Sequence, residues 1–544
     1  MPVITFSKRE LKNLLQGKVS DKVLQERIPM IGVSLDAFGD EIEVEVFPDR
    51  PDMLSVEGFA CAMSAFLDLT PGLRKIPVHK SDYRAVIDRK VKSVRPEAVC
   101  AVIKNVKFTD EAIRSLMQLQ EKLHITHGRD RKRVAIGVHD LDKIQFPVTY
   151  TTKPRDFEFI PLEETRKMSL EGILTQHKKG VAYAHLLDGY EEYPIWIDAR
   201  GTVLSMPPII NSVDTMLDEN TQNIFLDLTG YNKKWVEYAL HIVLLSLHMR
   251  RGTVFSVEVN DAGRKVVYPD FTPRKMKVDL AYLNKWIGLS LNKKDAKKCL
   301  EKMGYGVTAD FTMQIPAWRA DIMHPCDIAE DMAVGYGYDR LTPEIPELTT
   351  IARENPTETF VRKVAYLCCG FGLLEVKNYV LTNTRFLFER MNAPEEEVIE
   401  MENALNLDYN VLRPTLLPEM MNVYAINKHH ELPQNLFEVG KVVIPDDSTP
   451  EKCSEEVRLA VTLCHPSASF TEVKQILDAI MRNMEKRYSL AEKNHPSFID
   501  GRCGAIILGN EEIGVIGEIH PQVLNNWELE NPVAAFELNV ERLM

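Results

Sequence analysis

The sequence predicts an α+β protein built from several domains. Its 544 residues are enough for about three to five domains of ordinary size. Residues 41–47 alternate between polar and apolar side chains, as half-buried strands do. Residues 235–248 instead repeat apolar side chains at helical spacing. Both kinds of segment occur along the chain, without internal repeats or low-complexity tracts, so we expect several mixed domains in succession.

The composition is that of an ordinary globular protein, with 45% hydrophobic and 27% charged residues. The formal net charge of −13 argues against non-specific nucleic-acid binding by the whole surface. A nucleic-acid partner would need a local basic patch, or basic surface on another subunit. The densest basic cluster is Gly-Arg-Asp-Arg-Lys-Arg at 128–133, which predicts a solvated loop, with RNA contact as the alternative.

No part of the sequence indicates a secreted, zinc-bound or membrane protein. The nine cysteines show no Cys-x-x-Cys pairing, so neither a zinc site nor a disulfide framework is expected. No apolar run reaches the roughly 18 residues that span a membrane, and the N-terminus lacks the basic and apolar regions of a signal peptide. We expect a cytoplasmic protein with no membrane partner.

Residues 71–80 and 343–356 have the composition of linkers. We predict a small N-terminal α/β domain, a mixed α/β domain, a domain of two short helices and strands, and a domain with an antiparallel core, at 1–85, 86–268, 269–346 and 347–544. In the first of these, Ser7 and Glu10 predict a capping box at the start of a helix. In the last, residues 376–381 predict a strand.

Four carboxylates gather within a short stretch of the third domain: Asp321, Asp327, Glu330 and Asp331. Pro325 suits the first turn of a helix, where its missing N–H costs nothing. On that helix the last three carboxylates are spaced i, i+3, i+4 and project from one face. Oxygen donors that converge in this way suit a hard cation such as Mg²⁺. Acidic residues in a first helical turn also cap free N–H groups without any metal, so the spacing leaves both interpretations open.

The pattern Arg-x-Asp-Ile-x-His-x-x-Asp-Ile-x-Glu-Asp at 319–331, followed by Tyr-Gly-Tyr, resembles the β subunit of phenylalanyl-tRNA synthetase. The Asp-Arg-Pro-Asp turn at 49–52 and the segments 517–521 and 535–538 fit the same family. The resemblance covers essentially the whole chain and is to the short archaeal/eukaryotic type of subunit. It implies that the four carboxylates bind Mg²⁺ at a site shared with an α subunit.

The resemblance also implies partners and substrates. The family assembly is an α2β2 heterotetramer, and its substrates are ATP, phenylalanine and tRNA(Phe). The α subunit carries the adenylation site of this ligase. The chain is therefore expected to support ATP-dependent attachment of phenylalanine to tRNA(Phe) without catalysing adenylation itself.

The last domain resembles the antiparallel core of class II aminoacyl-tRNA synthetases in a degenerate form. Active domains place an arginine and a glutamate at the end of their second-motif strand, where this chain has Ile444 and Asp446. An aliphatic side chain cannot replace a bidentate guanidinium at the α-phosphate. The glycine-rich third motif is not found, and residues 540–543 are its nearest remnant. We expect a catalytically inactive fold that builds an interface.

The third domain, with helices predicted at 279–286 and 293–303 before its strands, is winged-helix-like. Four lysines on the second helix suggest DNA binding. That interpretation is weak, because no arginine, asparagine or glutamine set is placed for base readout and the nearby carboxylates would repel phosphates.

The resemblance makes the second domain an editing-type domain that deacylates mischarged tyrosyl-tRNA(Phe). Pro-Pro-x-Ile-Asn and Asp-x-Thr-Gly resemble the editing segments of the family. The candidate editing residues are Ser205, Pro207, Pro208, Asn211, Asp227, Thr229 and Gly230. From the residues alone, both segments also fit plain turns. No nucleophile–base pair is evident, so we expect a substrate-positioned water rather than a covalent intermediate.

Two other functions fit parts of the sequence. A free-standing tRNA deacylase would use the second domain alone, and a non-enzymatic winged-helix binding protein would use the third. Co-purification with an equimolar partner distinguishes a ligase subunit from a deacylase. Salt-dependent DNA affinity is the mark of the binding protein.

Overall fold

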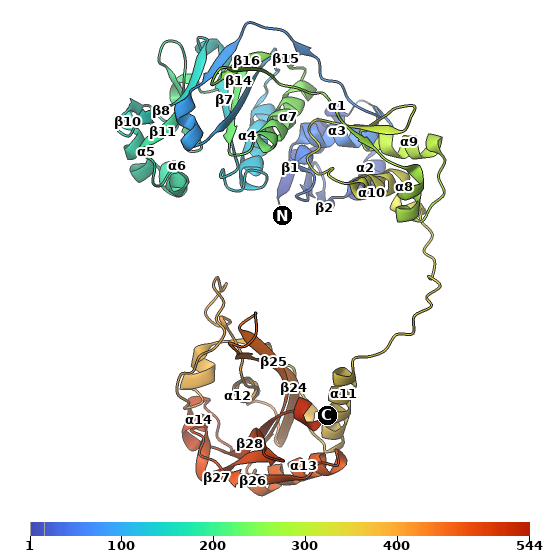
Figure 1. Ribbon diagram of the computed structural model, residues 1–544, viewed down its shortest axis with the longest axis vertical. Helices are drawn as coiled ribbons and strands as arrows, with labels where there is room; N and C mark the ends of the chain where they lie inside the picture. Colours follow the sequence, from blue (N-terminus) through green and yellow to red (C-terminus); the bar gives the residue numbers. More distant parts are fainter. Residues whose placement is uncertain (1, 16) are drawn as a thin grey trace. The chain divides into compact units, whose positions relative to one another are not determined.

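The computed structural model describes residues 2–15 and 17–544 and divides into two compact units, Met1–Glu344 and Ile345–Met544 (Figure 1). Residues 341–355 contain neither helix nor strand. The predicted α+β architecture of several domains is confirmed. Within the described residues, no helix is both long and apolar enough to cross a membrane.

The first unit begins with a small module of one sheet and three helices. Its antiparallel strands follow the order β1 (Val3–Ser7), β3 (Glu41–Glu45), β2 (Ser34–Phe38). The helices are α1 (Lys8–Leu14), α2 (Asp21–Arg27) and α3 (Val56–Phe66). α3 is almost wholly buried because it packs against α7 (Lys233–Met249) of the next module.

The capping box predicted at the start of α1 is wrong. Ser7 is the N-cap residue, but its side chain makes no hydrogen bond to the helix. Glu10 is buried and forms an ion pair with Arg250, which also pairs with Glu57 of α3. The carboxylate of Glu10 is therefore used between modules and not at its own helix end.

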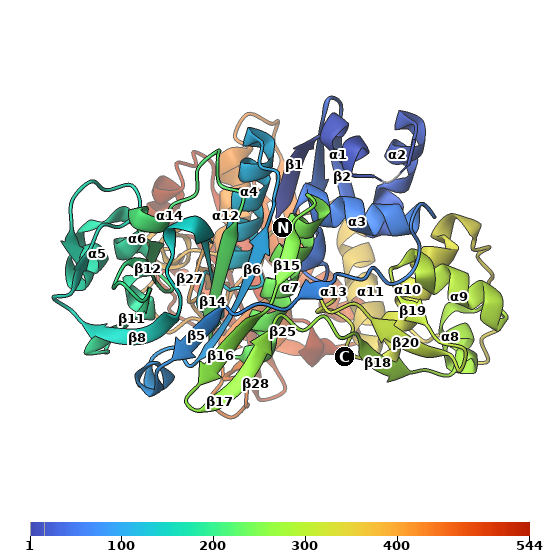
Figure 2. The same ribbon diagram turned by 90° about the horizontal axis from the view of Figure 1, so that it is seen from above.

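Two sheets that pack face to face form the second module. The five-stranded sheet has the order β4 (Val78–His79), β15 (Thr253–Phe255), β6 (Glu97–Lys104), β14 (Ile224–Gly230), β7 (Val134–Asp140). The seven-stranded sheet has the order β13 (Ile210–Asn211), β12 (Val203–Met206), β11 (Glu192–Ile197), β8 (Val148–Pro154), β5 (Arg84–Ile87), β16 (Val257–Asp261), β17 (Arg264–Tyr268). Helices α4 (Asp110–Ile125) and α7 pack against the five-stranded sheet (Figure 2). Trp196 of one sheet meets Phe225 of the other, with ring centroids 6.2 Å apart.

Short elements complete this module: β9 (Glu158–Phe159), β10 (Met168–Ser169), α5 (Leu170–Gln176) and α6 (Lys178–Tyr183). The linker predicted at 71–80 is wrong in part. Its residues Val78 and His79 form β4, which pairs in parallel with β15. Gly72 of the same segment donates its N–H to the carbonyl of Glu301 at 2.7 Å, so the segment is tied to the third module.

The third module contains a small sheet and three helices. The sheet has the order β18 (Arg274–Lys277), β20 (Thr312–Ile315), β19 (Gly306–Val307). The helices are α8 (Leu280–Ile287), α9 (Lys293–Lys302) and α10 (Pro325–Tyr336). The two predicted helices and the proline start of α10 are confirmed. One continuous hydrophobic core extends through all three modules of this unit.

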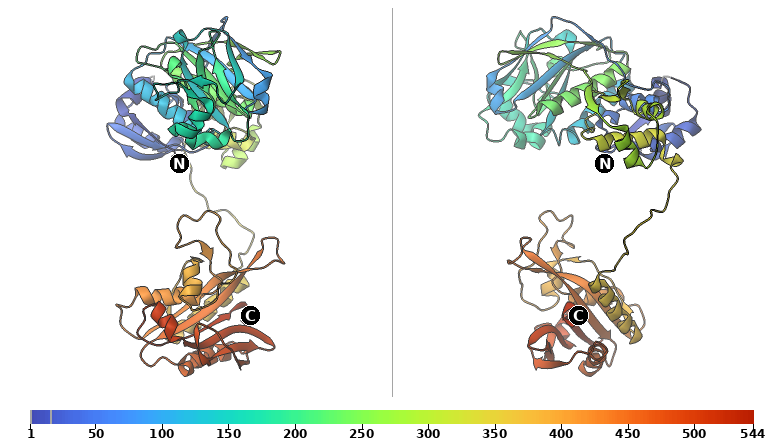
Figure 3. Two further views of the ribbon diagram at one scale, coloured as in Figure 1. Left: turned by 90° about the vertical axis from the view of Figure 1, so that its left-hand side faces the viewer. Right: turned by 45° about the vertical axis from the view of Figure 1, so that its right-hand side comes forward.

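The second unit is built on a seven-stranded sheet covered by helices on both faces (Figure 3). Its strand order is β21 (Leu374–Glu375), β24 (Gln434–Pro445), β25 (Cys453–Cys464), β29 (Val533–Asn539), β28 (Glu511–Ile519), β27 (Phe498–Leu508), β26 (Tyr488–Glu492). α11 (Pro356–Gly370) and α13 (Phe470–Asn483) share one core with the sheet. α12 (Leu417–Ile426) and α14 (Pro521–Asn526) share the other.

The strand predicted at 376–381 is wrong. The chain leaves the sheet after β21 and forms a separate pair between β22 (Leu381–Thr382) and β23 (Val411–Leu412). Between β21 and β22, side chains of the segment form hydrogen bonds to β24. Lys377 donates to the carbonyl of Val439 at 2.6 Å, and the Asn378 amide donates to Glu438 at 2.7 Å.

Candidate functional sites

Strand register places four side chains in a row across the seven-stranded sheet. Trp196 of β11 pairs with Tyr150 of β8 on one side and with Ser205 of β12 on the other. Ser205 in turn pairs with Asn211 of β13. Directly paired residues of neighbouring strands point to the same face of a sheet. Tyr150 and Trp196 stack within this row, with ring centroids 4.9 Å apart.

Asp227 of the five-stranded sheet meets this row. Ser205 Oγ donates to Asp227 Oδ2 at 3.1 Å, so this hydrogen bond joins the two sheets. His139 Nε2 lies 2.6 Å from the same oxygen, and His139 Nδ1 lies 2.9 Å from Thr215 Oγ1. Asp227, Ser205, His139 and Thr215 are here called the Asp227 cluster. All four are buried, and Asp227 is only 1% exposed. Two predicted editing residues, Ser205 and Asp227, are thus brought into contact.

A glycine makes room for the Asp227 cluster. Gly137 of β7 is the register partner of Asp227. A Cβ atom at Gly137 would lie 2.3 Å from Asp227 Oδ2 and 2.7 Å from His139 Nε2. Such contacts would displace both side chains. A glycine inside a β run often marks a close approach, and this is the one sequence signal that points to His139.

Thr229 is held by a buried arginine. Arg95 Nε donates to Thr229 Oγ1 at 2.9 Å, and Arg95 Nη2 donates to the carbonyl of Thr229 at 2.8 Å. Arg95 is 1% exposed, and burial lowers its pKa. The hydroxyl of Thr229 therefore fixes the end of β14 and does not join the Asp227 cluster.

The remaining predicted editing residues make no hydrogen bond to the cluster's side chains within the described residues. Pro207 and Pro208 are joined by a cis peptide bond. The Asn211 amide lies 3.5 Å from the carbonyl of Val138. A Cβ atom at Gly230 would lie 2.2 Å from the carbonyl of Arg133, so the end of β14 is closely packed against the 128–133 loop.

The sequence predicted that the 128–133 loop is solvated, but part of this loop is packed against the protein. Arg131 is buried, donates to the carbonyl of Ile209 at 2.7 Å and lies 4.5 Å from the Tyr183 ring. Arg133 lies 4.1 Å from the Trp235 ring. These contacts fix a loop with cationic and aromatic groups beside the cis-proline pair.

One donor in the layer between the sheets has no partner. Trp196 is fully buried, and its Nε1–H makes no hydrogen bond within the described residues. A buried N–H without a partner costs about 1–3 kcal/mol. Such a group calls for an acceptor from outside the chain, a water or a bound molecule.

The four carboxylates predicted to bind Mg²⁺, here called the α10 carboxylates, have protein partners at three positions. Arg319 donates to Asp321 from Nε at 2.9 Å and from Nη2 at 2.6 Å. The same Nη2 donates to Asp331 Oδ2 at 2.6 Å, and Tyr305 Oη donates to that oxygen at 2.6 Å. Burial opposes ionisation of Asp321, but the Arg319 guanidinium outweighs it and lowers the pKa of Asp321.

Asp327 caps α10. Its Oδ2 accepts the backbone N–H groups of Met323 and His324, each at 2.7 Å, and His324 completes a capping box. Burial opposes ionisation of Asp327, but these N–H groups lower its pKa. Glu330 is exposed and has no hydrogen-bond or ion-pair partner in the described part of the chain. The partial desolvation of its carboxylate, followed by the charges of Asp331 and Asp49, raises the pKa of Glu330.

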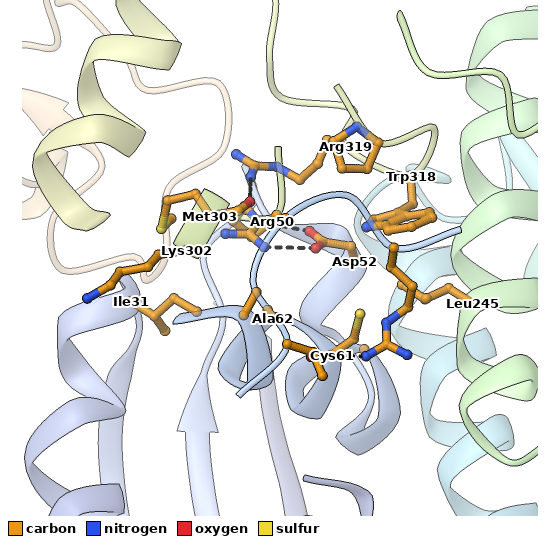
Figure 4. Close-up of a pocket in the computed structure, with 17 residues that line it drawn as sticks. Ile31, Arg50, Asp52, Cys61, Ala62, Leu245, Lys302, Met303, Trp318 and Arg319 are labelled. Carbon is orange, nitrogen blue, oxygen red and sulfur yellow. Dashed lines mark hydrogen bonds and ion pairs between the residues drawn. The ribbon is translucent and has the colours of Figure 1, made fainter. Parts of the chain in front are cut away.

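The Asp-Arg-Pro-Asp turn of the first module lies beside this region. Arg50 and Asp52 form two hydrogen bonds, of 2.9 and 2.8 Å, visible in Figure 4. Together with Arg319 they line a cavity of about 30 Å³, enough for about one water molecule. No set of three or more His, Cys, Asp and Glu side chains is arranged to hold a metal ion among residues 2–15 and 17–544. Groups of the chain itself therefore satisfy Asp321, Asp327 and Asp331, whereas Glu330 has no partner within the described residues.

In the second unit, the position assigned from the sequence to the second-motif arginine of active synthetases holds an aliphatic side chain. Ile444 lies in β24. Asp446 comes directly after this strand, and its carboxylate accepts the backbone N–H of Ser448 at 2.9 Å. Inside the unit, Arg413 Nη2 donates to the fully buried Glu438 at 2.7 Å. The surface of the unit carries large exposed hydrophobic side chains: Tyr366, Leu374, Tyr379, Leu405, Leu407 and Ile426.

Comparisons with known proteins match every part of this architecture. Residues 81–246 match a B3/4 domain, residues 276–338 match a tRNA synthetase B5 domain, and residues 341–540 match a phenylalanyl tRNA synthetase beta chain CLM domain. The first unit is similar to a crystal structure of an N-terminal fragment of the phenylalanyl-tRNA synthetase β-subunit from Pyrococcus horikoshii. That likeness has 36% identity and a TM-score of 0.60, and covers 62% of this chain and 99% of the fragment.

Full-length relatives give the same result. The chain is 38% identical to the phenylalanine–tRNA ligase β subunit of Archaeoglobus fulgidus, over 99% of this chain and 98% of the relative. It is 39% identical to the same subunit of Pyrococcus horikoshii, over 99% of both chains. The resemblance read from the carboxylate pattern is confirmed, and the chain belongs to the β-subunit family of phenylalanine–tRNA ligases.

Proposed function

We propose that this chain is the non-adenylating β subunit of a phenylalanine–tRNA ligase in the cytoplasm. Its partner would be an α subunit in an α2β2 heterotetramer, with ATP and phenylalanine bound by the α subunit and tRNA(Phe) bound by the assembly. The absence of a cation at Ile444 and Asp446 supports this division of labour. The large exposed hydrophobic side chains of the second unit are available for contact with a protein partner.

ATP–pyrophosphate exchange tests the first part of the proposal. The purified chain is expected to give no phenylalanine-dependent exchange, and exchange is expected once the α subunit is added. Exchange by the chain alone would mean that the second unit is an active synthetase domain. The full-length match to ligase subunits favours this function over the free-standing deacylase and the winged-helix binding protein.

We further propose that the second domain hydrolyses tyrosyl-tRNA(Phe). An apolar phenylalanine pocket rejects an isostere with one added hydroxyl by only about a hundredfold, so a second site must supply the missing selectivity. The observation that carries this proposal is the buried carboxylate of Asp227. Its Oδ2 is occupied by Ser205 and His139, whereas Oδ1 has no partner within the described residues. A tyrosine hydroxyl can donate to Oδ1, but phenylalanine would leave this oxygen unpaired.

The surroundings of Asp227 suit an aromatic substrate on tRNA. Tyr150, Trp196 and Phe225 form a fully buried aromatic layer beside Asp227. The cis-proline pair and Gly230 shape the backbone at its edge, and the 128–133 loop offers cations for the phosphates of the tRNA end. Ser205 bonds to the Asp227 carboxylate and to no histidine within the described residues, so no serine–histidine pair supports a covalent intermediate and a substrate-positioned water is favoured.

Deacylation of tyrosyl-tRNA(Phe) by the assembled enzyme tests this proposal. Asp227→Ala removes the acceptor for the hydroxyl and is expected to abolish most of the activity. Thr229→Ala acts through Arg95 and the strand end, so a smaller loss is expected. Unchanged hydrolysis in both variants would exclude the site, and no hydrolysis by the parent enzyme would exclude the editing function.

We propose Mg²⁺ binding at the α10 carboxylates, because their oxygen donors suit a hard cation. The donors do not form a ready site in the chain alone, since Arg319 holds Asp321 and one oxygen of Asp331. Binding by the chain alone is expected to be too weak to change its stability, and tighter binding is expected with the α subunit. The Asp327→Asn/Asp331→Asn double variant should assemble less well or lose its magnesium dependence. Assembly equal to the parent, with and without chelator, would leave these residues as helix-start acids only.

A further inference from the structure

We propose that His139 is a positioning residue that fixes the Asp227 carboxylate for the substrate hydroxyl. The proposal rests on the editing function proposed above and adds to it a residue outside both predicted segments. His139 is fully buried in β7, and its ring joins Thr215 on one side to Asp227 on the other. The ring therefore acts through Asp227 and does not need to touch the substrate.

The hydrogen bonds define the tautomer of His139. Asp227 Oδ2 accepts the Ser205 hydroxyl and lies 2.6 Å from His139 Nε2, so Nε2 carries the hydrogen. In the neutral ring, Nδ1 then accepts the hydroxyl hydrogen of Thr215 across 2.9 Å. Thr215, His139 and Asp227 form a chain in which every hydrogen points toward the carboxylate.

This arrangement leaves one oxygen of Asp227 for a ligand. Two donors, His139 and Ser205, converge on Oδ2 and fix the plane of the carboxylate. Oδ1 accepts no hydrogen bond within the described residues, so it is the acceptor left for a phenol. A carboxylate held in place before substrate arrives does not have to reorganise when it binds.

Gly137 provides an independent way to disturb the same arrangement. A Cβ atom there would lie 2.3 Å from Asp227 Oδ2 and 2.7 Å from His139 Nε2. Gly137→Ala would push the two side chains apart without removing any hydrogen-bonding group. It should therefore have the same kinetic effect as loss of the His139 donor.

The test compares two amides at position 139 in the assembled ligase. In His139→Gln the amide nitrogen lies near the position of Nε2 and can still donate to Asp227, whereas the shorter amide in His139→Asn cannot reach it. We expect His139→Asn and Gly137→Ala to lose about 10- to 100-fold in kcat/KM for tyrosyl-tRNA(Phe) deacylation. His139→Gln should keep most of the activity. Aminoacylation should be unchanged in all three variants.

His241→Gln is the matched control, because His241 is also a buried histidine but bonds to the carbonyl of Ala317, away from the cluster. It should deacylate like the parent. Equal activity in His139→Asn and the parent would overturn the proposal. So would equal losses in His139→Gln and His139→Asn that follow their losses in melting temperature, because these would indicate a merely structural role.

A second measurement separates this proposal from the editing function. Selective ¹⁵N-histidine labelling of the full chain, with His139→Gln used for assignment, reports which ring nitrogen of His139 carries the hydrogen. The Nε2–H form is expected, and the Nδ1–H form would overturn the positioning role even if the parent deacylates. If the parent shows the Nε2–H form but no deacylation, the editing function itself fails.

Discussion

The Asp227 cluster and the α10 carboxylates are both acidic sites, but their charges are balanced in different ways. The buried carboxylate of Asp227 is bonded by Ser205 and His139, and by no lysine or arginine within the described residues. Its Oδ1 accepts no hydrogen bond from these residues. Asp321 and Asp331 share the guanidinium of Arg319. The first arrangement leaves an acceptor for a ligand, whereas the second satisfies the acids from within. The partner of a carboxylate, more than its burial, therefore decides whether it is available for binding.

The largest expected effect is the loss of stability when Arg319, the partner of Asp321 and Asp331, is removed. Arg319→Met leaves Asp321 and Asp331 buried without their cation, and loss of one member of a buried ion pair costs about 3–5 kcal/mol. Urea unfolding of the full chain measures this loss as a lower midpoint for the first unit. Arg340→Met is the matched control, because Arg340 is exposed just after α10, where its guanidinium bonds to the carbonyl of Tyr336 at 3.2 Å and lies over the Tyr336 ring. A loss below about 1 kcal/mol for Arg319→Met would show that the pair is not needed.

A pH prediction concerns β7, the strand that carries His139 of the Asp227 cluster. His124 accepts the N–H of Ile136, next to Gly137 in β7, and burial lowers the pKa of His124 to about 4. Because this pKa is depressed, the unfolded state binds the proton first as pH falls. The contribution of neutral His124 to the free energy of unfolding is complete above about pH 6.5 and is lost as the pH falls to about 4. Its size is about 3 kcal/mol at most.

Unfolding of the parent and of His124→Gln at several pH values tests this prediction. Glutamine can keep the acceptor for Ile136 but cannot titrate, so the variant should lose less stability on acidification. Identical pH profiles for the two proteins would contradict the assignment. Arg319, the counter-charge at α10, does not titrate in this range, because arginine stays protonated.

A pair of isosteric changes contrasts the two sites directly. Asp227→Asn keeps an oxygen that accepts from His139 and Ser205, so stability should change by less than about 1 kcal/mol. Its amide replaces the free acceptor by a donor, so tyrosyl-tRNA(Phe) deacylation should fall about a hundredfold. Asp331→Asn should show the reverse, a stability loss of about 1–3 kcal/mol with unchanged deacylation. The same pattern in both variants would erase the distinction between the two sites.

How far the sequence predicts these sites depends on whether the partners are local. The strands and helices were predictable because their apolar periodicity is local, as in β3 and α7. The helix start at Pro325 and the carboxylate spacing were predictable for the same reason. Ser205 and Asp227 came from a resemblance and not from any local pattern.

The parts that were missed depend on long-range pairing. His139 contacts Asp227 across 88 positions in the chain, and Arg250 reaches Glu10 across 240. No spacing rule reveals such partners, so the Glu10 carboxylate looked like a helix cap and Arg131 looked like a solvated charge. Arg319 is the exception: it lies two residues before Asp321, but its role as the counter-charge of Asp331 also depends on how α10 packs.

The smallest expected effect is a loss of stability in Asp327→Ala. It tests whether Asp327 caps α10 or binds Mg²⁺ in the chain without the α subunit. Its Oδ2 accepts two backbone N–H groups at the start of α10, so Asp327→Ala should cost about 1 kcal/mol, the usual loss for a helix cap. Glu330→Ala is the control on the same helix and should change stability by less than about 0.5 kcal/mol, since Glu330 is exposed and has no partner within the described residues. Unfolding midpoints measured with Mg²⁺ and with chelator should agree for the parent, because the cap needs no cation. A midpoint that rises with Mg²⁺ in the parent but not in either variant would mean that the carboxylates already bind the ion without the α subunit, and that internal pairing with Arg319 does not exclude it.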